Sequence, residues 1–399
     1  MEVLVLWEVS RKQDYIFASN KLKENIGASI IIEEVTEDLP FRINKAYRDN
    51  LIYNGGGSSL YKFDNTDLAR EFVKNISEEI IRKYPGIEVF MVIEEYDEEI
   101  DKIIDKIENA YKKLAIKKNR RTNSGTQNAF GIEKICEATG LPASYRDTED
   151  LDGQERFISE EVKLKIKKSD ERSKKFDRLL PEGVKGIKDF RDLAKGEKNY
   201  LAVVYIDGNK MGQKFDKLKT YFSYEDGDYA KTNREYLTAL RKFSDNVRDA
   251  FENAFKAMTE EINQNQEKIK DFTYIKDEKF PVIPIIVAGD DITYVTNGKI
   301  GIESAKVFLE HLNKNAIEIH NGQMVSLNAC AGVAIARVSY PFSKTYQLAE
   351  DLCNTAKRKI AMDYPDLDKD FSLIDWHIEQ GDLMGTISEI REEHYKTLD

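Results

Sequence analysis

The sequence has few of the residues that build disulfide frameworks, zinc ribbons and histidine-based hydrolase sites. Its three cysteines, Cys136, Cys330 and Cys353, lie far apart, and none belongs to a CxxC pair. This spacing predicts a reduced chain with no zinc ribbon of its own and no bound zinc. Only four histidines occur, all in the last quarter, and there is no HExxH or His-Asp dipeptide. Zinc hydrolases and metal phosphohydrolases are therefore disfavoured.

Long apolar runs and a leader segment are also lacking. No window approaches the roughly 18 consecutive apolar residues of a membrane-spanning helix. The opening MEVLVLWEVSRKQDY has no basic lead and carries Glu2 and Glu8 inside its apolar run. It is typical of a first strand rather than of a signal peptide. We expect a cytoplasmic protein without a membrane partner.

Positive charge is in deficit, with 61 Lys and Arg against 72 Asp and Glu and a net charge of −11. This balance argues against broad coating of nucleic acid, which needs a basic face. One stretch departs from it: KKLAIKKNRR (112–121) holds six cations in ten residues. A solvated helix end is the simpler interpretation, and a local basic groove is the alternative.

Two parts of the chain repeat one order of expected elements. In each, a strand and a helical stretch are followed by a hairpin, an amphipathic helix and a further strand. The expected strands and hairpins are EVLVLWEV (2–9), LIYNGGGSSLYKF (51–63), IEVFMVIEEY (87–96), YLAVVYID (200–207), IIVAGDDITYV (285–295) and SLNACAGVAIARV (326–338). This β-α-β-β-α-β order is ferredoxin-like, and its recurrence indicates an internal duplication. The fold class predicted is α+β.

A charged, irregular segment separates the two repeats. It includes CEATGLPASYRDTEDLDGQE and the lysine-rich EEVKLKIKKSDERSKK. We expect a first domain over 1–111, a helical linker insert with little core over 112–197, and a second domain over 198–399. The length of 399 residues suffices for two or more domains.

The second repeat carries three acidic residues at the ends of its strands. Asp207 ends the first strand, and Asp290 and Asp291 lie at the hairpin tip. The first strand and the hairpin strands are neighbours in such a sheet, so the three carboxylates should lie close together, where they repel one another. Mg²⁺ would relieve this repulsion, and two such ions can clamp an in-line phosphoryl transfer. A polar loop tip remains the simpler explanation of a lone GDD.

Further candidate nucleotide-binding residues surround these acids. The turn after Asp207 leads into a helix N-terminus, which is a suitable cradle for a triphosphate. Lys357 should project from the last amphipathic helix towards the same end of the sheet, although a lone helical lysine is usually solvated. The other candidates in this repeat are Gly208, Asn209, Lys210 and Gly289.

The first repeat has the same frame without the acidic hairpin. NGGGSSLY (54–61) stands where the acidic tip would be, and Glu8 is the single acid at the end of the first strand. Gly55, Gly56 and Gly57, with Ser58, would let a ligand approach the backbone closely. A second nucleotide pocket without metals and a plain hairpin turn explain this stretch equally well.

The chain as a whole resembles the Cas-ten family, the polymerase-cyclase large subunit of type III CRISPR effector complexes of the Cmr and Csm types. QDYIFASNKLKENIGASIIIEE and YNGGGSSLYKF are similar to the first Palm domain of that family. ICEATGLPA and ISEEVKLK are similar to its zinc-ribbon region, with most of the metal-binding cysteines gone. YIDGNKMG, AGDDITYV, CAGVAIARVSYPF and AEDLCNTAKRK are similar to its second, catalytic Palm.

The resemblance implies two ferredoxin-like Palm domains joined by a degenerate zinc-ribbon-like linker. It also implies that ATP is joined into cyclic oligonucleotide messengers for antiviral signalling, with Mg²⁺ or Mn²⁺ as cofactor. Asp207, Asp290 and Asp291 match the metal ligands, and Lys357 matches the phosphate-binding lysine. Gly55 to Ser58 match the glycine-rich turn that faces the second nucleotide.

The sequence departs from the family in four places. Ala288 replaces the first glycine of GGDD, and Asn209 stands where an acid is common. The HD nuclease and the C-terminal helical domain of the family are not recognised. These departures favour a short form that works as a stand-alone signalling cyclase.

Other functions remain open on the sequence. A non-catalytic nucleotide sensor or a scaffold subunit of a CRISPR-like complex is the main alternative, and a template-directed polymerase is a third. Three clustered carboxylates favour the enzyme. Candidate partners are NTP substrates, a second copy of the chain or CRISPR-like effector subunits, and RNA as an activator.

Overall fold

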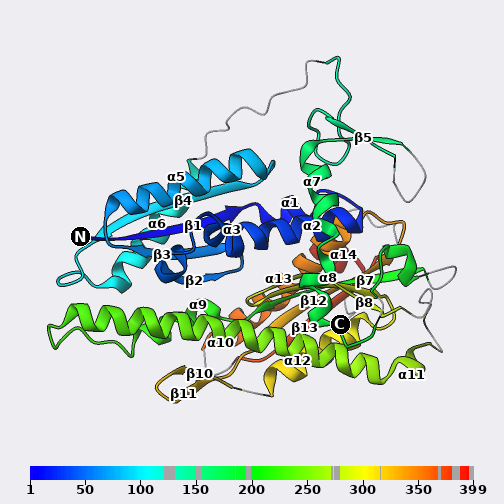
Figure 1. Cartoon of the computed structure of the whole chain (residues 1–399). Coiled ribbons are helices and arrows are strands. Elements are labelled where there is room, and N and C mark those ends of the chain that lie inside the picture. The colour runs from blue at the N-terminus through cyan, green and yellow to red at the C-terminus, as the bar shows by residue number, and fades with distance from the viewer. Residues whose placement is uncertain are drawn as a thin grey trace.

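The protein is a mixed α+β structure, seen here in a computed structural model (Figure 1). The structure describes residues 1–120, 131–148, 155–184, 186–194, 199–270, 273, 279–314, 316–366, 370–379 and 387–394. The α+β class predicted from the sequence is confirmed.

The first sheet has four strands in the order β2-β3-β1-β4, and all neighbouring strands are antiparallel. Its central strand β1 is covered on both faces, so that Val3 to Trp7 are fully buried. Helix α5 presents a stripe of buried residues at helical spacing to this sheet, and Asn65 caps its first turn. The elements of this part are β1 (Glu2–Ser10), α1 (Lys12–Phe17), α2 (Leu22–Glu33), the π-helical turn η1 (Glu34–Asp38), α3 (Leu39–Ile43), α4 (Tyr47–Asn50), β2 (Leu51–Gly55), β3 (Ser58–Phe63), α5 (Thr66–Lys83), β4 (Glu88–Tyr96) and α6 (Ile103–Asn119).

The second sheet has five strands in the order β13-β12-β7-β9-β8. Four of them follow the strand order of the first sheet, and β13, which the sequence did not predict, adds in parallel to β12. A small hairpin, β10–β11, also escaped prediction. The elements are β7 (Tyr200–Gly208), α9 (Met211–Lys219), α10 (Tyr229–Gln264), α11 (Gln266–Lys270), β8 (Val282–Ala288), β9 (Asp291–Asn297), α12 (Gly301–Asn313), β10 (Ile317–His320), β11 (Gln323–Val325), β12 (Ala329–Arg337), α13 (Phe342–Asp363), β13 (Leu373–Ile378) and α14 (Ile387–His394).

The segment between the two sheets packs against helix α2 of the first half. Its described elements are β5 (Tyr145–Asp147), β6 (Arg156–Ile158), α7 (Glu160–Ser169), α8 (Arg172–Lys175), η2 (Asp177–Leu179) and η3 (Phe190–Leu193). Helix α7 packs against α2 so closely that a Cβ at Gly27 would lie 1.7 Å from the Lys165 carbonyl oxygen. Lys165 is buried and donates hydrogen bonds to the Tyr15 carbonyl and to Glu161. Within this segment, Cys136, Ile158 and Val162 form a small core cluster of their own.

Helix α6 runs across residue 111, where the sequence suggested a domain boundary. It packs on β4 of the first sheet and ends at Asn119. The basic stretch at 112–121 therefore lies partly in this helix, and residue 121 falls outside the described residues. The proposed division into three domains stays a prediction, with α6 assigned by its packing to the first sheet.

The long helix α10 joins the two sheets (Figure 1). It packs along α12 of the second half and touches β2 of the first. Its Asn233 side chain accepts a hydrogen bond from the Ile103 amide and donates to the carbonyls of Glu98 and Asp101. Among the described residues, no helix has both the length and the apolar character needed to cross a membrane.

Candidate active site

Strands β7, β8 and β9 bring three carboxylates to one edge of the second sheet. Asp207 and Asp291 form the last register pair between β7 and β9. A two-residue turn joins β8 to β9, with Gly289 at a φ of 65°, a conformation that favours glycine. The Gly208 amide donates to the Asp290 carbonyl at 3.2 Å, and a Cβ at Gly208 would lie 2.9 Å from Asp290 Cβ. The structure thus brings together the three acids singled out in the sequence.

Burial and mutual repulsion make two of these acids hard to ionise. Burial, followed by the charge of Asp207, raises the pKa of Asp291 to about 8 and that of Asp290 to about 6. The positive charge of Lys12 partly offsets the rise in pKa of both acids, and that of Lys357 does so for Asp290. The edge therefore holds acids that gain from any additional positive charge.

Lys357 reaches this edge from α13, as the sequence predicted. Its Nζ lies 2.5 Å from Asp207 Oδ2 and donates to the Gly208 carbonyl at 2.8 Å. The helix can lie this close to the sheet because β12 has Gly332 at the crossing. A Cβ there would lie 1.9 Å from the Ala349 carbonyl oxygen and 2.5 Å from the Cys353 nitrogen. With these two polar partners, Lys357 is not the solvated helical lysine that the sequence left as an alternative.

Two other predicted residues of this turn, Asn209 and Lys210, donate side-chain hydrogen bonds to backbone carbonyls. Asn209 is buried, and its Nδ2 donates to the Phe371 carbonyl at 2.8 Å. Lys210 has a left-handed φ of 52°, and its Nζ donates to the carbonyls of Tyr364 and Asp366 at 2.7 and 2.6 Å. Both side chains fix the segment after α13, and their roles as nucleotide ligands stay predictions.

Lys12 connects the glycine hairpin of the first sheet with the acidic residues of the second. Gly56 and Gly57 form the tip of this hairpin with φ of 57° and 79°. Lys12 Nζ donates to the Gly56 carbonyl, and its charge also lowers the pKa of Asp290 and Asp291. The sequence did not single out Lys12, because nothing in a lone lysine at a helix start distinguishes it from a solvated one.

The three acids at this edge are the candidate ligands for a divalent cation. Within the described ranges, no three His, Cys, Asp or Glu side chains converge as a ready-made metal site. Asp291 Oδ1, however, is buried without a hydrogen-bond partner, and an unsatisfied carboxylate oxygen is what a hard cation takes. Asp207, Asp290 and Asp291 are the side chains that could hold Mg²⁺ or Mn²⁺. The absence of zinc stays a prediction.

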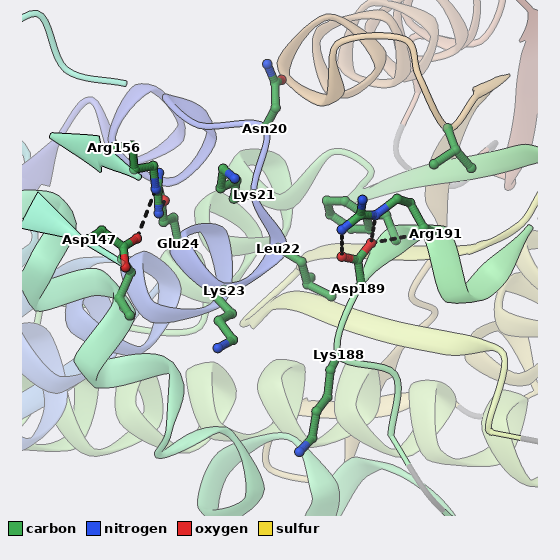
Figure 2. Close-up of a pocket in the computed structure, with 13 residues that line it drawn as sticks. Asn20, Lys21, Leu22, Lys23, Glu24, Asp147, Arg156, Lys188, Asp189 and Arg191 are labelled. Carbon is green, nitrogen blue, oxygen red and sulfur yellow. Dashed lines mark hydrogen bonds and ion pairs between the residues drawn. The ribbon is translucent and has the colours of Figure 1, made fainter. Parts of the chain in front are cut away.

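A separate cavity of about 320 Å³ lies where α2 begins, beside the insert and the segment before β7 (Figure 2). Five of its charged side chains are paired with one another: Arg156 with Asp147 and Glu24, and Arg191 with Asp189. None of the residues predicted for the site lines this cavity. The acidic edge is thus distinct from it.

Part of the chain is similar to a known family, and the fold is similar to solved structures. Residues 200–363 match the family model of Cas10/Cmr2, second palm domain. No curated protein matches the sequence. The fold is similar to the Csm1–Csm4 cassette in its apo form and with AMPPNP, each with a TM-score of 0.55 and 16% identity over 90% of this chain and 53% of the matched chain. The cassette in complex with cA4 matches with the same TM-score and coverage at 15% identity.

The chain spans about half the length of these structures, and at such identity the likeness shows the fold. The matched segment 200–363 contains β7, the β8–β9 hairpin and α13, and with them all three carboxylates and Lys357. The resemblance noted in the sequence is thereby confirmed for this segment, which is similar to the second palm domain of Cas10/Cmr2.

Proposed function

We propose that the protein is a metal-dependent nucleotidyltransferase that joins ATP or other NTPs into cyclic oligonucleotide messengers. The observation that carries this proposal is the edge where Asp207 and Asp291 pair in register beside Asp290 and Lys357. In this proposal the two sheets are two ferredoxin-like Palm domains, and the second is the catalytic one.

Each residue has a role that follows from its position. Asp207, Asp290 and Asp291 would hold Mg²⁺ or Mn²⁺, which supplies charge stabilisation for in-line phosphoryl transfer. Lys357 binds phosphate oxygens beside Asp207, and the N-terminus of α9 at Met211 follows the same turn. Buried carboxylates that resist ionisation favour occupation by a cation over an empty site.

The glycine hairpin supports a second nucleotide opposite the first. Cβ atoms added at Gly55 and Gly56 would meet nothing within 4 Å, so the space beside this tip is open. Two nucleotides held on facing hairpins would be positioned for bond formation between them, which is what a dinucleotide or longer product requires. Structures of the Csm1–Csm4 cassette with cA4 and AMPPNP show nucleotides on proteins of this fold.

A subunit role in a CRISPR-like effector is the second candidate. It is favoured by the matched structures, one of which is the Csm1–Csm4 subcomplex of the type III-A CRISPR-Csm interference complex. The two candidates differ in what the isolated protein does. A scaffold or sensor binds nucleotide or partners without turning NTP over.

One experiment separates them. The purified protein is incubated with each NTP and Mn²⁺, and products are identified by mass spectrometry, with Asp290→Asn/Asp291→Asn as the matched inactive control. Cyclic or linear oligonucleotides formed by the parent and not by the variant support the proposal. Nucleotide binding without any product, under every NTP, would leave the sensor or scaffold role.

A further inference from the structure

The end of the first sheet repeats the end of the second residue by residue. Glu8 and Ser58 form the last register pair between β1 and β3, as Asp207 and Asp291 do between β7 and β9. The next hydrogen bond is also repeated. The Val9 amide donates to the Gly57 carbonyl at 2.9 Å, and the Gly208 amide donates to the Asp290 carbonyl at 3.2 Å. Glu8 therefore corresponds to Asp207.

The turn that follows each first strand repeats as well. Arg11 and Lys210 both stand three residues after these acids, and both have a φ of 52°. Each is the residue directly before a helix, α1 or α9. A left-handed conformation is uncommon in residues other than glycine, so its recurrence at matching positions indicates a shared turn design.

The helices that cover the two sheet ends, α6 and α13, also have buried residues at the same spacing. The buried side chains of α6, namely Ile103, Ile107, Ala110 and Leu114, correspond in spacing to Phe342, Tyr346, Ala349 and Cys353 of α13. In this alignment Lys118 corresponds to Lys357. Lys118 Nζ lies 2.9 Å from Glu8 Oε1, just as Lys357 Nζ lies 2.5 Å from Asp207 Oδ2. The lysine–acid pair of the second half thus exists in the first half too.

The two ends differ in charge. Gly57 and Ser58 take the places of Asp290 and Asp291, so Glu8 is the one acid among these matched positions. Lys118 pairs with Glu8, and Lys12 donates to the Gly56 carbonyl. With two fewer carboxylates, the first end has no need of a divalent cation to neutralise it, and an anion meets less repulsion there.

We propose that Lys118 binds the triphosphate of a nucleotide on the first half, without a metal ion. Its partner Glu8 orients the ammonium as Asp207 orients Lys357. This inference deepens the proposed function, on which it rests, by naming the cation of the second nucleotide site. It also assigns a use to one lysine of the basic stretch 112–121.

The test is binding of a non-hydrolysable ATP analogue measured by calorimetry, in EDTA and in Mg²⁺, for the parent and for Lys118→Met. The parent should keep one site in EDTA, and Lys118→Met should weaken that site about tenfold or more, since a charge-assisted hydrogen bond is lost. Lys118→Arg should recover part of the affinity. Lys106→Met is the matched control. Lys106 is about as exposed as Lys118 and pairs with Asp101 at 3.1 Å, but it lies about 18 Å from Lys118 along α6.

The outcomes decide the inference separately from the proposed function. Unchanged affinity of Lys118→Met in EDTA overturns the role of Lys118, even if the parent makes product. Weakened binding with a melting temperature equal to that of Lys106→Met supports it, even if no product forms. A parent that binds no nucleotide in either condition contradicts both. A lower melting temperature with unchanged affinity shows that Lys118 only braces α6.

Discussion

Asp291 stands directly opposite Asp207 at the open end of the β7–β9 ladder. Like charges placed opposite each other destabilise a sheet. Their presence at a partly buried edge, beside Asp290, destabilises the fold, and a bound cation would remove this repulsion. Two predictions about these acids follow from this arrangement.

The first concerns activity. Replacing Asp290 and Asp291 together by alanine should reduce product formation about a hundredfold or more, because the charge stabilisation that they organise is lost. Folding should be intact, and the melting temperature without metal should hold or rise, since repulsion is relieved. Product analysis and thermal unfolding in EDTA check this. Turnover at the parent rate would show that the site has been assigned to the wrong residues.

The second concerns pH. The pKa of Asp291 is raised to about 8 in the folded protein, so the folded state holds its proton more tightly than the unfolded state does. The resulting stability is full below about pH 4 and is lost as the pH rises through about 8, by about 1.4 kcal/mol per pH unit in between. In EDTA, Asp291→Asn should flatten this part of the curve of unfolding free energy against pH. The exposed Asp64→Asn serves as control, and equal slopes in both variants would contradict the prediction.

The third concerns the glycine hairpin. Gly56→Leu should fill the open space beside the tip and reduce the ATP:protein stoichiometry from two to one, with loss of product. Leucine at a φ of 57° is strained by about 1–2 kcal/mol, so some loss of melting temperature is expected. Gly227→Leu, at a φ of 75° and also with no atom within 4 Å of its Cβ, controls for that strain. Two sites retained in calorimetry, with normal synthesis, would reduce NGGGSSLY to an ordinary turn.

The fourth concerns the close approach of α13 to β12. Gly332→Ala places a methyl group 1.9 Å from the Ala349 carbonyl oxygen, so the helix must shift. We expect a loss of about 1–3 kcal/mol in unfolding free energy, measured with urea, and weaker ATP binding because Lys357 moves with the helix. Gly212→Ala in α9, where the added Cβ meets nothing within 4 Å, should be neutral or slightly stabilising. A stable Gly332→Ala protein with parent affinity would show that α13 adapts without moving Lys357.

Local patterns allowed much of the fold to be predicted. The apolar runs predicted the strands of both repeats. The repeated order of elements predicted which strands are neighbours, and therefore that Asp207 would lie near the GDD turn. The fifth strand β13 was missed because it pairs in parallel beyond the repeat, where no hairpin turn marks it. Lys12 and Lys118 were missed because their partners are distant in sequence: Gly56 for Lys12, and Glu8 for Lys118.

Helix α10 has a consequence for the relative position of the two halves. It is packed into the second half and also fastened through Asn233 to three backbone groups of the first half. Asn233 thus ties a helix of the second half to the backbone of the first half through hydrogen bonds that need no ligand. We therefore expect the two halves to keep the same relative position before and after a nucleotide binds.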